Sequence, residues 1–536
     1  MGVDLPQDAL GEAADGSGPP ALAGNDYDLL PYPSMPITRT RPAHLAALAA
    51  LFGLSAPAVG RARVLELGCA AGGNIIPLAA QYPSARFTGL DLSARHIDDG
   101  RNRIAACGLG NIGLRQADLA AFVPDGQAFD YVICHGVFSW VPRPVQDAIL
   151  RICRDALAPD GLAAISYNVL PGWDLRAVIR DICLHYAGAD GPPRHRVARA
   201  RAALERIVQS SPRDQPYGMS LRAEVSRLRP MPAAYILGEF LAPDNAPCSV
   251  QDFIARAGQG GLDYLCEADL SASTLGALGP VLQDSLSSIG TGRAAIEQRI
   301  DFLTGRTFRC SVMVRKPAAS RQPMPSAARL RRLHVASPLH FDAAGSTHDI
   351  VKFSSGRGPP IATGDPVVRR AFMGLAAAYP ATVGFDELAA VATGDATDTG
   401  ATRARIGDAL LPLVLSGQAS VSALPLQVGR AFDERPKVWA FARIEAASRQ
   451  PWITSLGHVG VPVHPVLRAL LPYLDGSHDR AALRALFIDA MASGAPGVTE
   501  LPADQASLPA ERPDAVAAHH VEQTLRFCER HALLEP

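Results

Sequence analysis

The stretch V-L-E-L-G-C-A-A-G-G-N, residues 64–74, decides the fold of this chain. It joins a short apolar run to a loop of small residues, and the helical-looking segment IIPLAAQY follows. Small residues let the backbone approach a ligand closely, and a helix N-terminus favours polar or anionic groups. We therefore expect a strand, a ligand-binding loop and a helix here.

Outward from this stretch, short apolar runs alternate with segments whose apolar residues recur at three- and four-residue spacing. Such alternation of strands and helices predicts a parallel, doubly wound α/β sheet. Two later apolar runs, separated by the helical EQRIDFLTG, bring the expected number of strands to seven. The seven runs are residues 64–67, 86–92, 112–119, 129–136, 162–168, 261–269 and 308–316.

Changes in composition divide the 536 residues into a core and several appended parts. The Gly/Pro-rich start reads as a disordered leader, an Arg- and Ala-rich helical stretch as an insertion, and KPAASRQPMPSA as a linker. Two small, mainly helical, winged-helix-like domains are expected to follow. The expected boundaries are leader 1–24, core 25–187, helical insertion 188–245, end of the core 246–317, linker 318–329, and C-terminal domains 330–425 and 426–536.

Composition excludes several classes of protein. The formal net charge is −1, so the chain is not a general polyanion binder, and we expect no nucleic-acid partner. No apolar run is long enough to span a bilayer and the N-terminus lacks a signal-peptide pattern, so a cytoplasmic protein without a membrane span is expected. The nine cysteines form no CxxC and the histidines no HExxH, so no metal site is expected.

The loop after the first strand is compatible with two cofactors. Gly68, Ala70 and Gly73 imitate the G-x-G-x-x-G of dinucleotide enzymes with one substitution. An S-adenosylmethionine enzyme instead needs an acid two residues before the first glycine, where Glu66 stands, to engage the methionine ammonium.

Acids after the next two strands favour S-adenosylmethionine. Asp91 at the tip of the second strand is placed to accept hydrogen bonds from the ribose, which both cofactors require. Asp118 after the third strand is placed to read the adenine amino group, or simply caps a loop. The residues expected to contact the cofactor are Glu66, Gly68, Cys69, Ala70, Gly72, Asn74, Asp91, Leu92, Asp118, Leu119 and His135.

Aromatic residues follow the fourth and fifth strands. His135, Phe138 and Trp140 in HGVFSWVP are expected beyond the strand end, where α/β sheets place ligands and where aromatic rings attract an alkylammonium. They could instead cover the sheet edge, and His135 could bind cofactor, act as a base or cap the turn. Tyr167 and Asn168 are expected to face the donor methyl, although Tyr167 could equally pack in the core.

An aromatic, Pro-rich segment precedes the core and reads N-D-Y-D-L-L-P-Y-P-S, residues 25–34. It is compatible with a lid over the pocket or with a plain surface arm. Tyr32 in this segment joins His135, Trp140, Tyr167 and Asn168 as the expected catalytic residues.

Taken together, the motifs resemble those of a known family. YDLLPYPS, VLELGCAAGGNIIPLA, HGVFSWVP, LAPDGLAAISYNVLPGW, EFLAPDNAPCSVQDF, GLDYLCEADL and EQRIDFLTGRTFR occur in the order seen in bacterial class I methyltransferases with a methyltransferase regulatory domain. The rickettsial protein-lysine methyltransferases belong to this group. The resemblance covers about residues 25–317 and is weaker beyond them.

The resemblance implies a Rossmann-like, S-adenosylmethionine-dependent enzyme that methylates protein lysine side chains. It departs from the general pattern at Ala70, where glycine is usual and a methyl is tolerable if φ is negative, and at Phe138, where tyrosine is common. Alternatives are a small-molecule methyltransferase and a cofactor-binding regulatory or scaffold protein. We expect a protein substrate, and a homodimer because helical insertions in such sheets often dimerise.

Overall fold

The computed structural model describes residues 29–30, 33–273, 292–316, 324–394, 400–448, 450–493 and 513–536. The chain forms two compact units. The first contains residues 1–35 and 54–323, and the second contains residues 36–53 and 324–536. The expected leader, residues 1–24, lies outside the described residues.

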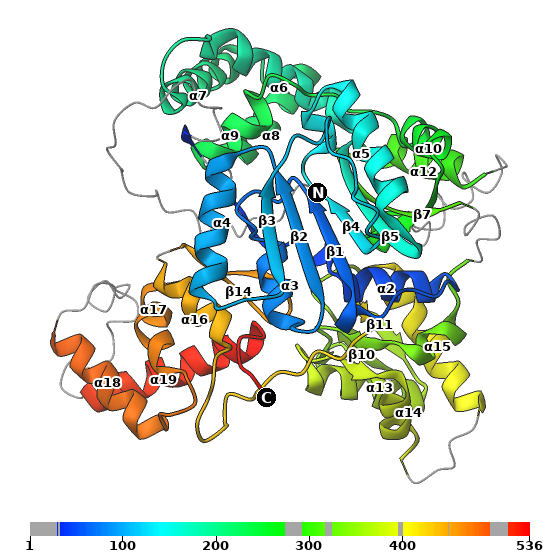
Figure 1. Ribbon diagram of the computed structural model, residues 1–536. Coiled ribbons are helices and arrows are strands. Elements are labelled where there is room, and N and C mark those ends of the chain that lie inside the picture. Colours follow the sequence, from blue (N-terminus) through cyan, green and yellow to red (C-terminus); the bar gives the residue numbers. More distant parts are fainter. Residues whose placement is uncertain are drawn as a thin grey trace. The chain divides into compact units, whose positions relative to one another are not determined.

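A seven-stranded sheet forms the centre of the first unit, with strand order β3-β2-β1-β4-β5-β7-β6 (Figure 1). Strands β1 to β5 are parallel, whereas β7 runs antiparallel to both β5 and β6. The order reverses at β1, so the carboxyl ends of β1 and β4 flank the crevice where such sheets bind ligands. The strands are Arg63–Leu67, Arg86–Asp91, Ile112–Gln116, Phe129–Cys134, Leu157–Asn168, Leu262–Glu267 and Phe308–Arg315.

Each strand forms where the sequence predicts it, and the expected seven-stranded, Rossmann-like methyltransferase sheet is confirmed. The central strands β1 and β4 are almost entirely buried, because helices cover both faces of a parallel sheet. The helices of this layer are α3 Ile75–Gln81, α4 Ala94–Ala106, α5 Arg143–Ala156, α10 Val250–Gln259 and α12 Arg293–Thr304. Helix α5 buries Ile149, Leu150 and Cys153 against the sheet in one core cluster.

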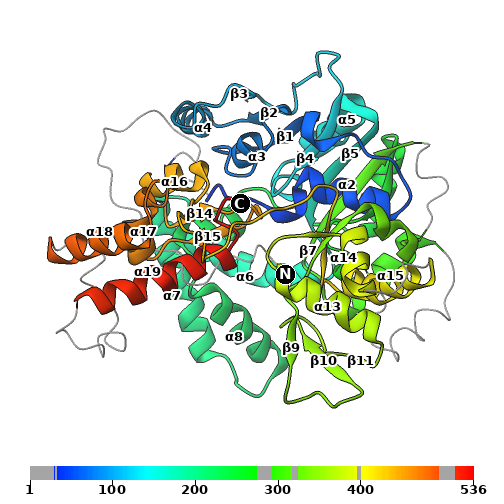
Figure 2. The same ribbon diagram turned by 90° about the horizontal axis from the view of Figure 1, so that it is seen from below.

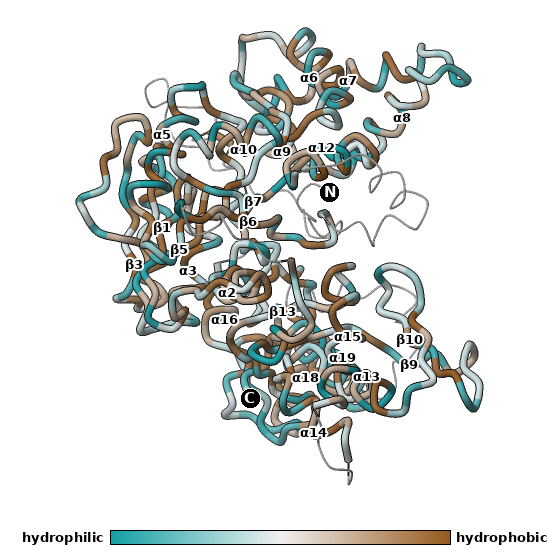
Figure 3. Tube along the Cα trace, turned by 90° about the vertical axis from the view of Figure 1, so that its right-hand side faces the viewer, coloured by the Kyte–Doolittle hydropathy of each residue, from teal (hydrophilic) through white to brown (hydrophobic). Residues whose placement is uncertain are grey.

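The expected insertion is a cluster of helices with a hydrophobic core of its own. Helices α7 Pro193–Ser210, α8 Pro216–Leu228 and α9 Ala233–Phe240 pack with α6 Gly172–Ala187, which the sequence had assigned to the core. Figure 2 shows α6, α7 and α8 together, and Figure 3 shows hydrophobic and hydrophilic residues interleaved along α6 and α7. This interleaving is typical of amphipathic helices that bury one face.

The second unit is mainly helical, with small antiparallel sheets. Strands β12 Val383–Gly384, β8 His334–Ala336 and β13 Ser420–Ser422 form one sheet beside α13 Pro366–Ala378, α14 Phe385–Thr393 and α15 Gly400–Leu415. Strands β9 His340–Asp342, β10 Val351–Ser354 and β11 Ile361–Thr363 form another. The last part holds α16 Ala440–Ala447, β14 Trp452–Thr454, β15 Gly460–Pro462, α17 Pro465–Leu470, α18 Arg480–Ala492 and α19 Pro513–Arg530.

The segment 36–53 differs from the sequence prediction, which placed it in the core 25–187. Helix α2, Pro42–Leu51, packs within the second unit, where the Ala423 amide donates to the carbonyl of Ala43. Nearby, Thr38 Oγ1 donates to the carbonyl of His458 at 2.8 Å. All but two of the ten residues of α2 are buried, so the helix is a core element of the second unit.

Among the described residues, no helix is long and apolar enough to cross a membrane.

Candidate active site

The glycine-rich loop after β1 is held against the ends of β2 and β4. The amides of Gly68 and Cys69 both donate to the carbonyl of Leu90, at 2.8 and 2.9 Å. Gly68 has φ +72°, and a Cβ there would lie 2.3 Å from a methyl group of Val137. Glycine is therefore required at this position for both conformation and space.

Glu66 lies buried in β1 beneath this loop, and its carboxyl is only half satisfied. Asn74 Nδ2 donates to Glu66 Oε1 at 2.7 Å, whereas Glu66 Oε2 is buried and has no hydrogen-bond partner among the described residues. Burial raises the pKa of Glu66 to about 8, partly offset by the Asn74 hydrogen bond. A buried unpartnered oxygen is costly, and a ligand ammonium would satisfy it. The site therefore fits the cofactor expected here.

Asp91 ends β2 and fixes the loop from the other side. Its Oδ2 accepts from the amide of Ala70 at 2.8 Å, and its Oδ1 accepts from the amide of Ser93 at 2.9 Å. Next to it, the side chain of Leu92 is 61% exposed. This pairing of an acid with an exposed apolar surface suits a ribose and an adjoining adenine.

Ala70 carries a backbone strain that the sequence did not predict. Its φ is +46°, in the left-handed region, so the negative φ that would have made its methyl group tolerable is not found. A non-glycine residue there costs about 1–2 kcal/mol. The loop keeps the shape that glycine would give, because the hydrogen bond from the Ala70 amide to Asp91 holds it in place.

Asp118 follows β3 and makes the loop cap that was one of its two expected roles. Its Oδ1 accepts from the amide of Ala120 at 2.8 Å, while the neighbouring Leu119 is buried in the core. A carboxylate oxygen can accept further hydrogen bonds, so this cap is compatible with contact to adenine. The roles of Asp118 and Leu119 in cofactor binding stay predictions.

Ser34 also contacts the loop, and sequence reasoning missed it. The amide of Gly73 donates to Ser34 Oγ at 2.8 Å, and a Cβ at Gly73 would lie 2.0 Å from the carbonyl oxygen of Ser34. The aromatic, Pro-rich segment 25–34, which contains Ser34, was the only sequence pattern that pointed to this contact. Tyr32, the expected catalytic residue of the same segment, lies outside the described residues.

Two aromatic pairs flank the carboxyl ends of β4 and β5. His135 lies 5.5 Å from Phe308, ring centre to ring centre, and Trp140 meets Trp173 in a T-shaped contact at 5.7 Å. Asn168 is the register partner of Phe308, and its amide N–H donates to Ser139 Oγ at 2.9 Å, beside Trp140. Trp173 and Phe308 had no predicted role, although Trp173 closes the motif SYNVLPGW.

Tyr167 packs in the core, which is the second of the two positions expected for it. Its hydroxyl makes a 3.0 Å hydrogen bond with Ser311 Oγ, and its ring stacks on Phe253 at 4.0 Å. Side chains alternate across a strand, so Tyr167 and Asn168 point to opposite faces. Phe138 is also fully buried, against Phe253, and belongs to the core.

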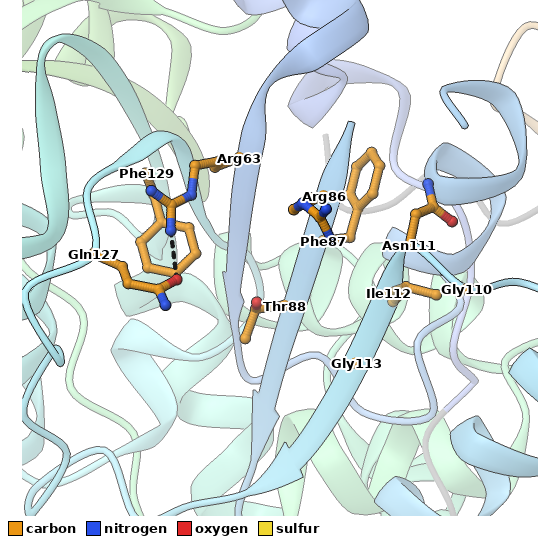
Figure 4. Close-up of a pocket in the computed structure, with 10 residues that line it drawn as sticks. All are labelled: Arg63, Arg86, Phe87, Thr88, Gly110, Asn111, Ile112, Gly113, Gln127 and Phe129. Carbon is orange, nitrogen blue, oxygen red and sulfur yellow. Dashed lines mark hydrogen bonds between the residues drawn. The ribbon is translucent and has the colours of Figure 1, made fainter. Parts of the chain in front are cut away.

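A cavity of about 270 Å³ lies at the opposite, amino ends of the strands and is not this site. Figure 4 shows Arg63 and Gln127 hydrogen-bonded on one side of it, with Arg86 and Asn111 on the other. Parallel sheets bind their ligands at the carboxyl ends, where the glycine-rich loop lies. Among the described residues, no group of His, Cys, Asp or Glu side chains is arranged to hold a metal ion.

Family models match three parts of the chain. Residues 64–161 match "Methyltransferase domain", residues 232–315 match "Predicted methyltransferase regulatory domain", and residues 434–533 match "PKMT, C-terminal winged helix domain". The last match confirms the expected winged helix within residues 426–536.

Similar proteins and structures cover most of the chain. An uncharacterized protein of Rickettsia prowazekii, RP789, is 30% identical over 86% of this chain and 85% of its own length. A second, RP028, is 33% identical over 43% of this chain and 93% of its own length. The structure of PKMT2 from Rickettsia typhi, 24% identical, superposes with TM-score 0.83 over 94% of this chain and all of its own.

A further structure of Rickettsia typhi PKMT2, in complex with AdoHcy, superposes with TM-score 0.81 over the same share of both chains. The half-satisfied Glu66, the paired Asp91 and the glycine-rich loop all lie within the residues that match "Methyltransferase domain". The chain belongs to the family of S-adenosylmethionine-dependent class I methyltransferases that carry a methyltransferase regulatory domain and a C-terminal winged helix domain.

Proposed function

We propose that the protein transfers methyl groups from S-adenosylmethionine to lysine side chains of other proteins. The observation that carries the proposal is the aromatic group at the ends of β4 and β5, in which Trp140 contacts Trp173 and His135 contacts Phe308. Aromatic rings attract alkylammonium groups. The winged helix match to PKMT supports a macromolecular acceptor, since a metabolite needs no such docking area.

The residues of this chain would act mainly by positioning. When bound, the cofactor would supply a methyl group carried on a sulfonium. A neutral amine forms the new C–N bond to this methyl carbon as the C–S bond breaks, and the thioether leaves. Glu66 and Asp91 would hold the two ends of the cofactor, and Trp140 and Asn168 would orient the amine along the reacting axis. Fixed orientation of this kind lowers the barrier without a covalent intermediate.

The lysine amine must lose its proton before the transfer, because its reference pKa is about 10.4. An apolar, aromatic surrounding lowers that pKa by disfavouring the charged form. We assign the proton-accepting role to His135, which follows β4 and whose ring centre lies 5.5 Å from that of Phe308. A His135→Ala variant is expected to keep cofactor binding and lose turnover at neutral pH; full turnover in that variant would remove the base role.

The experiment that tests the proposed function is transfer of labelled methyl groups into a bacterial lysate, followed by size fractionation. Label on lysine in protein bands supports the proposal. Label in the low-mass fraction would indicate a small-molecule methyltransferase, and cofactor binding without transfer a regulatory or scaffold protein. The chain has only three lysines, Lys316, Lys352 and Lys437, so self-labelling is easily mapped and subtracted.

A further inference from the structure

Trp173 is nearly fully buried, yet its indole N–H has no hydrogen-bond partner. The side chain is 1% exposed, and Nε1 is unpartnered within the part of the chain that the structure describes. The rest of the ring is in contact: the Arg176 guanidinium lies 5.4 Å from its centre, and Trp140 meets it at 5.7 Å. The ring faces therefore have neighbours, whereas the N–H makes no hydrogen bond to any described residue.

Another tryptophan of the same chain shows the usual arrangement. Trp439, in the second unit, is also buried, and its Nε1 donates to the carbonyl of Thr454 at 2.7 Å. Buried indole N–H groups usually find such a partner, because leaving one unpaired destabilises the folded state. The contrast indicates that, among the described residues, Trp173 lacks the partner that a buried indole normally has.

A second unpartnered donor lies five residues earlier in the chain, at the end of β5. Asn168 is 3% exposed, and its side-chain Nδ2 has no partner among the described residues, although its backbone amide donates to Ser139 and its carbonyl accepts from Cys248. Trp173 and Asn168 are tied together locally, because the Trp173 amide donates to the carbonyl of Val169 at 3.1 Å. Two buried donors therefore stand at the end of β5, beside Trp140.

We propose that the indole N–H of Trp173 binds a peptide carbonyl oxygen of the methyl acceptor, with Asn168 Nδ2 as the accompanying donor. An indole N–H donates and never accepts, so its ligand must present an oxygen or another acceptor atom. A protein lysine brings such oxygens in the backbone on either side of its alkylamine. Trp173 thereby distinguishes a lysine within a peptide from a free alkylamine.

The position in the sheet separates this ligand from the cofactor. The loop residues Glu66 and Asp91 lie at the ends of β1 and β2, whereas Asn168 ends β5, two strands away from β1 in the order β1-β4-β5. Trp140 after β4 lies between the two places along the sheet edge. The inference rests on the proposed function for the identity of the acceptor.

The test observes the indole N–H directly and needs no turnover. The chain has four tryptophans, so ¹⁵N-labelled protein gives four indole signals, which the single Trp→Phe variants assign. S-adenosylhomocysteine is added first, then N-acetyl-lysine-N-methylamide, and in a parallel sample pentylamine, which lacks carbonyl groups. The signal of Trp173 is expected to move with the lysine amide and not with the other two.

Three results would overturn the inference. Movement of the Trp173 signal with S-adenosylhomocysteine alone would assign the N–H to the cofactor. Equal movement with pentylamine would remove the carbonyl from the interaction, and no movement with any probe would mean that the group is structural. Because the readout is binding, a failure of methyl transfer in the lysate experiment remains a separate result about the proposed function.

A matched pair of variants gives an independent test. Both substitutions shorten a buried side chain and leave a cavity, so both should lower thermal stability, and Trp439→Phe more so because it also breaks a hydrogen bond. Trp173→Phe should raise KM for a lysine peptide about 2- to 10-fold with cofactor affinity unchanged, whereas Trp439→Phe should leave KM unchanged. An unchanged KM, or weaker cofactor binding, in Trp173→Phe would contradict the inference.

Discussion

Two buried carboxyl groups in the same sheet have opposite surroundings. Glu66 on the central strand β1 has one oxygen paired with Asn74 and one unpartnered, and its pKa is raised to about 8. Glu267 on the edge strand β6 accepts from Ser311 Oγ at 2.6 Å and lies 3.0 Å from Nη1 of Arg309. These partners outweigh its burial, so the pKa of Glu267 is lowered.

The difference separates a ligand site from a structural cluster. Arg309 is fully buried and also pairs with Asp301 at 2.8 Å and with Glu297 at 3.0 Å, so each group in that cluster has partners within the protein. Removing one member of a satisfied buried cluster is strongly destabilising, because the others are left as buried charges without compensation. A half-satisfied carboxyl such as Glu66 is completed only by a ligand.

The largest expected effect follows from breaking the satisfied cluster. Arg309→Met leaves Glu267, Glu297 and Asp301 buried without their main cation, and we expect a loss of about 3–5 kcal/mol in the free energy of unfolding. Urea unfolding measures it. The loss should be smaller at pH 5 than at pH 8, because protonation removes the unpaired negative charges. An unchanged unfolding midpoint would show that the cluster is not structural.

The second prediction is that removing the charge of Glu66 weakens cofactor binding without lowering the stability of the folded protein. Glu66→Gln keeps the acceptor for Asn74 but removes the charge, so S-adenosylmethionine should bind about 10- to 100-fold more weakly, the value of one charge-assisted hydrogen bond. Stability of the unliganded protein should be unchanged or higher. Calorimetric titration and thermal unfolding measure the two quantities. Glu267→Gln is the control, for which the opposite pattern is expected.

The third prediction concerns pH. With a folded-state pKa of about 8, Glu66 is protonated at neutral pH in the unliganded protein. Pairing with the cofactor ammonium requires it to ionise, so binding releases a proton and affinity rises by at most about tenfold per pH unit up to pH 8. Calorimetry in buffers of different ionisation enthalpy detects the proton. Proton release that persists in Glu66→Gln would assign it elsewhere.

The raised pKa of Glu66 also makes the folding stability of the unliganded protein depend on pH. A carboxyl whose pKa is raised on folding favours the folded state fully below its unfolded pKa, and that contribution is lost as pH rises toward the folded value. For Glu66 the window runs from 4.5 to about 8. Unliganded protein should therefore lose stability across this window relative to Glu66→Gln, as thermal unfolding at several pH values would show.

The smallest expected effect comes from the strained loop itself. Ala70→Gly removes the side chain that is strained at φ +46°, at the cost of greater freedom in the unfolded chain. We expect a gain of about 0–1 kcal/mol in stability and a slightly higher cofactor affinity. Ala71→Gly in the same loop is a control without the positive φ. Lower stability in Ala70→Gly would mean that the alanine contributes packing instead.

Much of the fold could be predicted because the strands carry a local signal. Apolar runs of strand length alternating with helical periodicity placed all seven strands within a few residues. The membership of 36–53 in the second unit could not be read this way, since it depends on contacts more than 280 residues distant, such as Ala43 with Ala423. One signal was present: PAHLAALAAL is apolar on every side, and such helices are buried on every side.

The site could be predicted in part for a similar reason. Glu66, Asp91 and the glycines stand at fixed spacings from strands, so their positions followed from the sequence. Core packing and a place near the donor methyl stayed equally open for Tyr167, because the sequence does not tell which face a side chain takes when both faces of a strand are buried. Trp173 was missed because an unpartnered N–H is a property of the packed structure and leaves no pattern in the sequence.

The path of residues 36–53 has a consequence for fragment complementation. If the backbone is cut between residues 316 and 324, the N-terminal fragment still carries helix α2, a core element of the second unit. The two fragments should therefore remain associated without a peptide bond, and separately expressed halves should reassemble by donating that helix. Deleting 324–536 would instead leave an apolar helix without a core, and aggregation is the expected outcome.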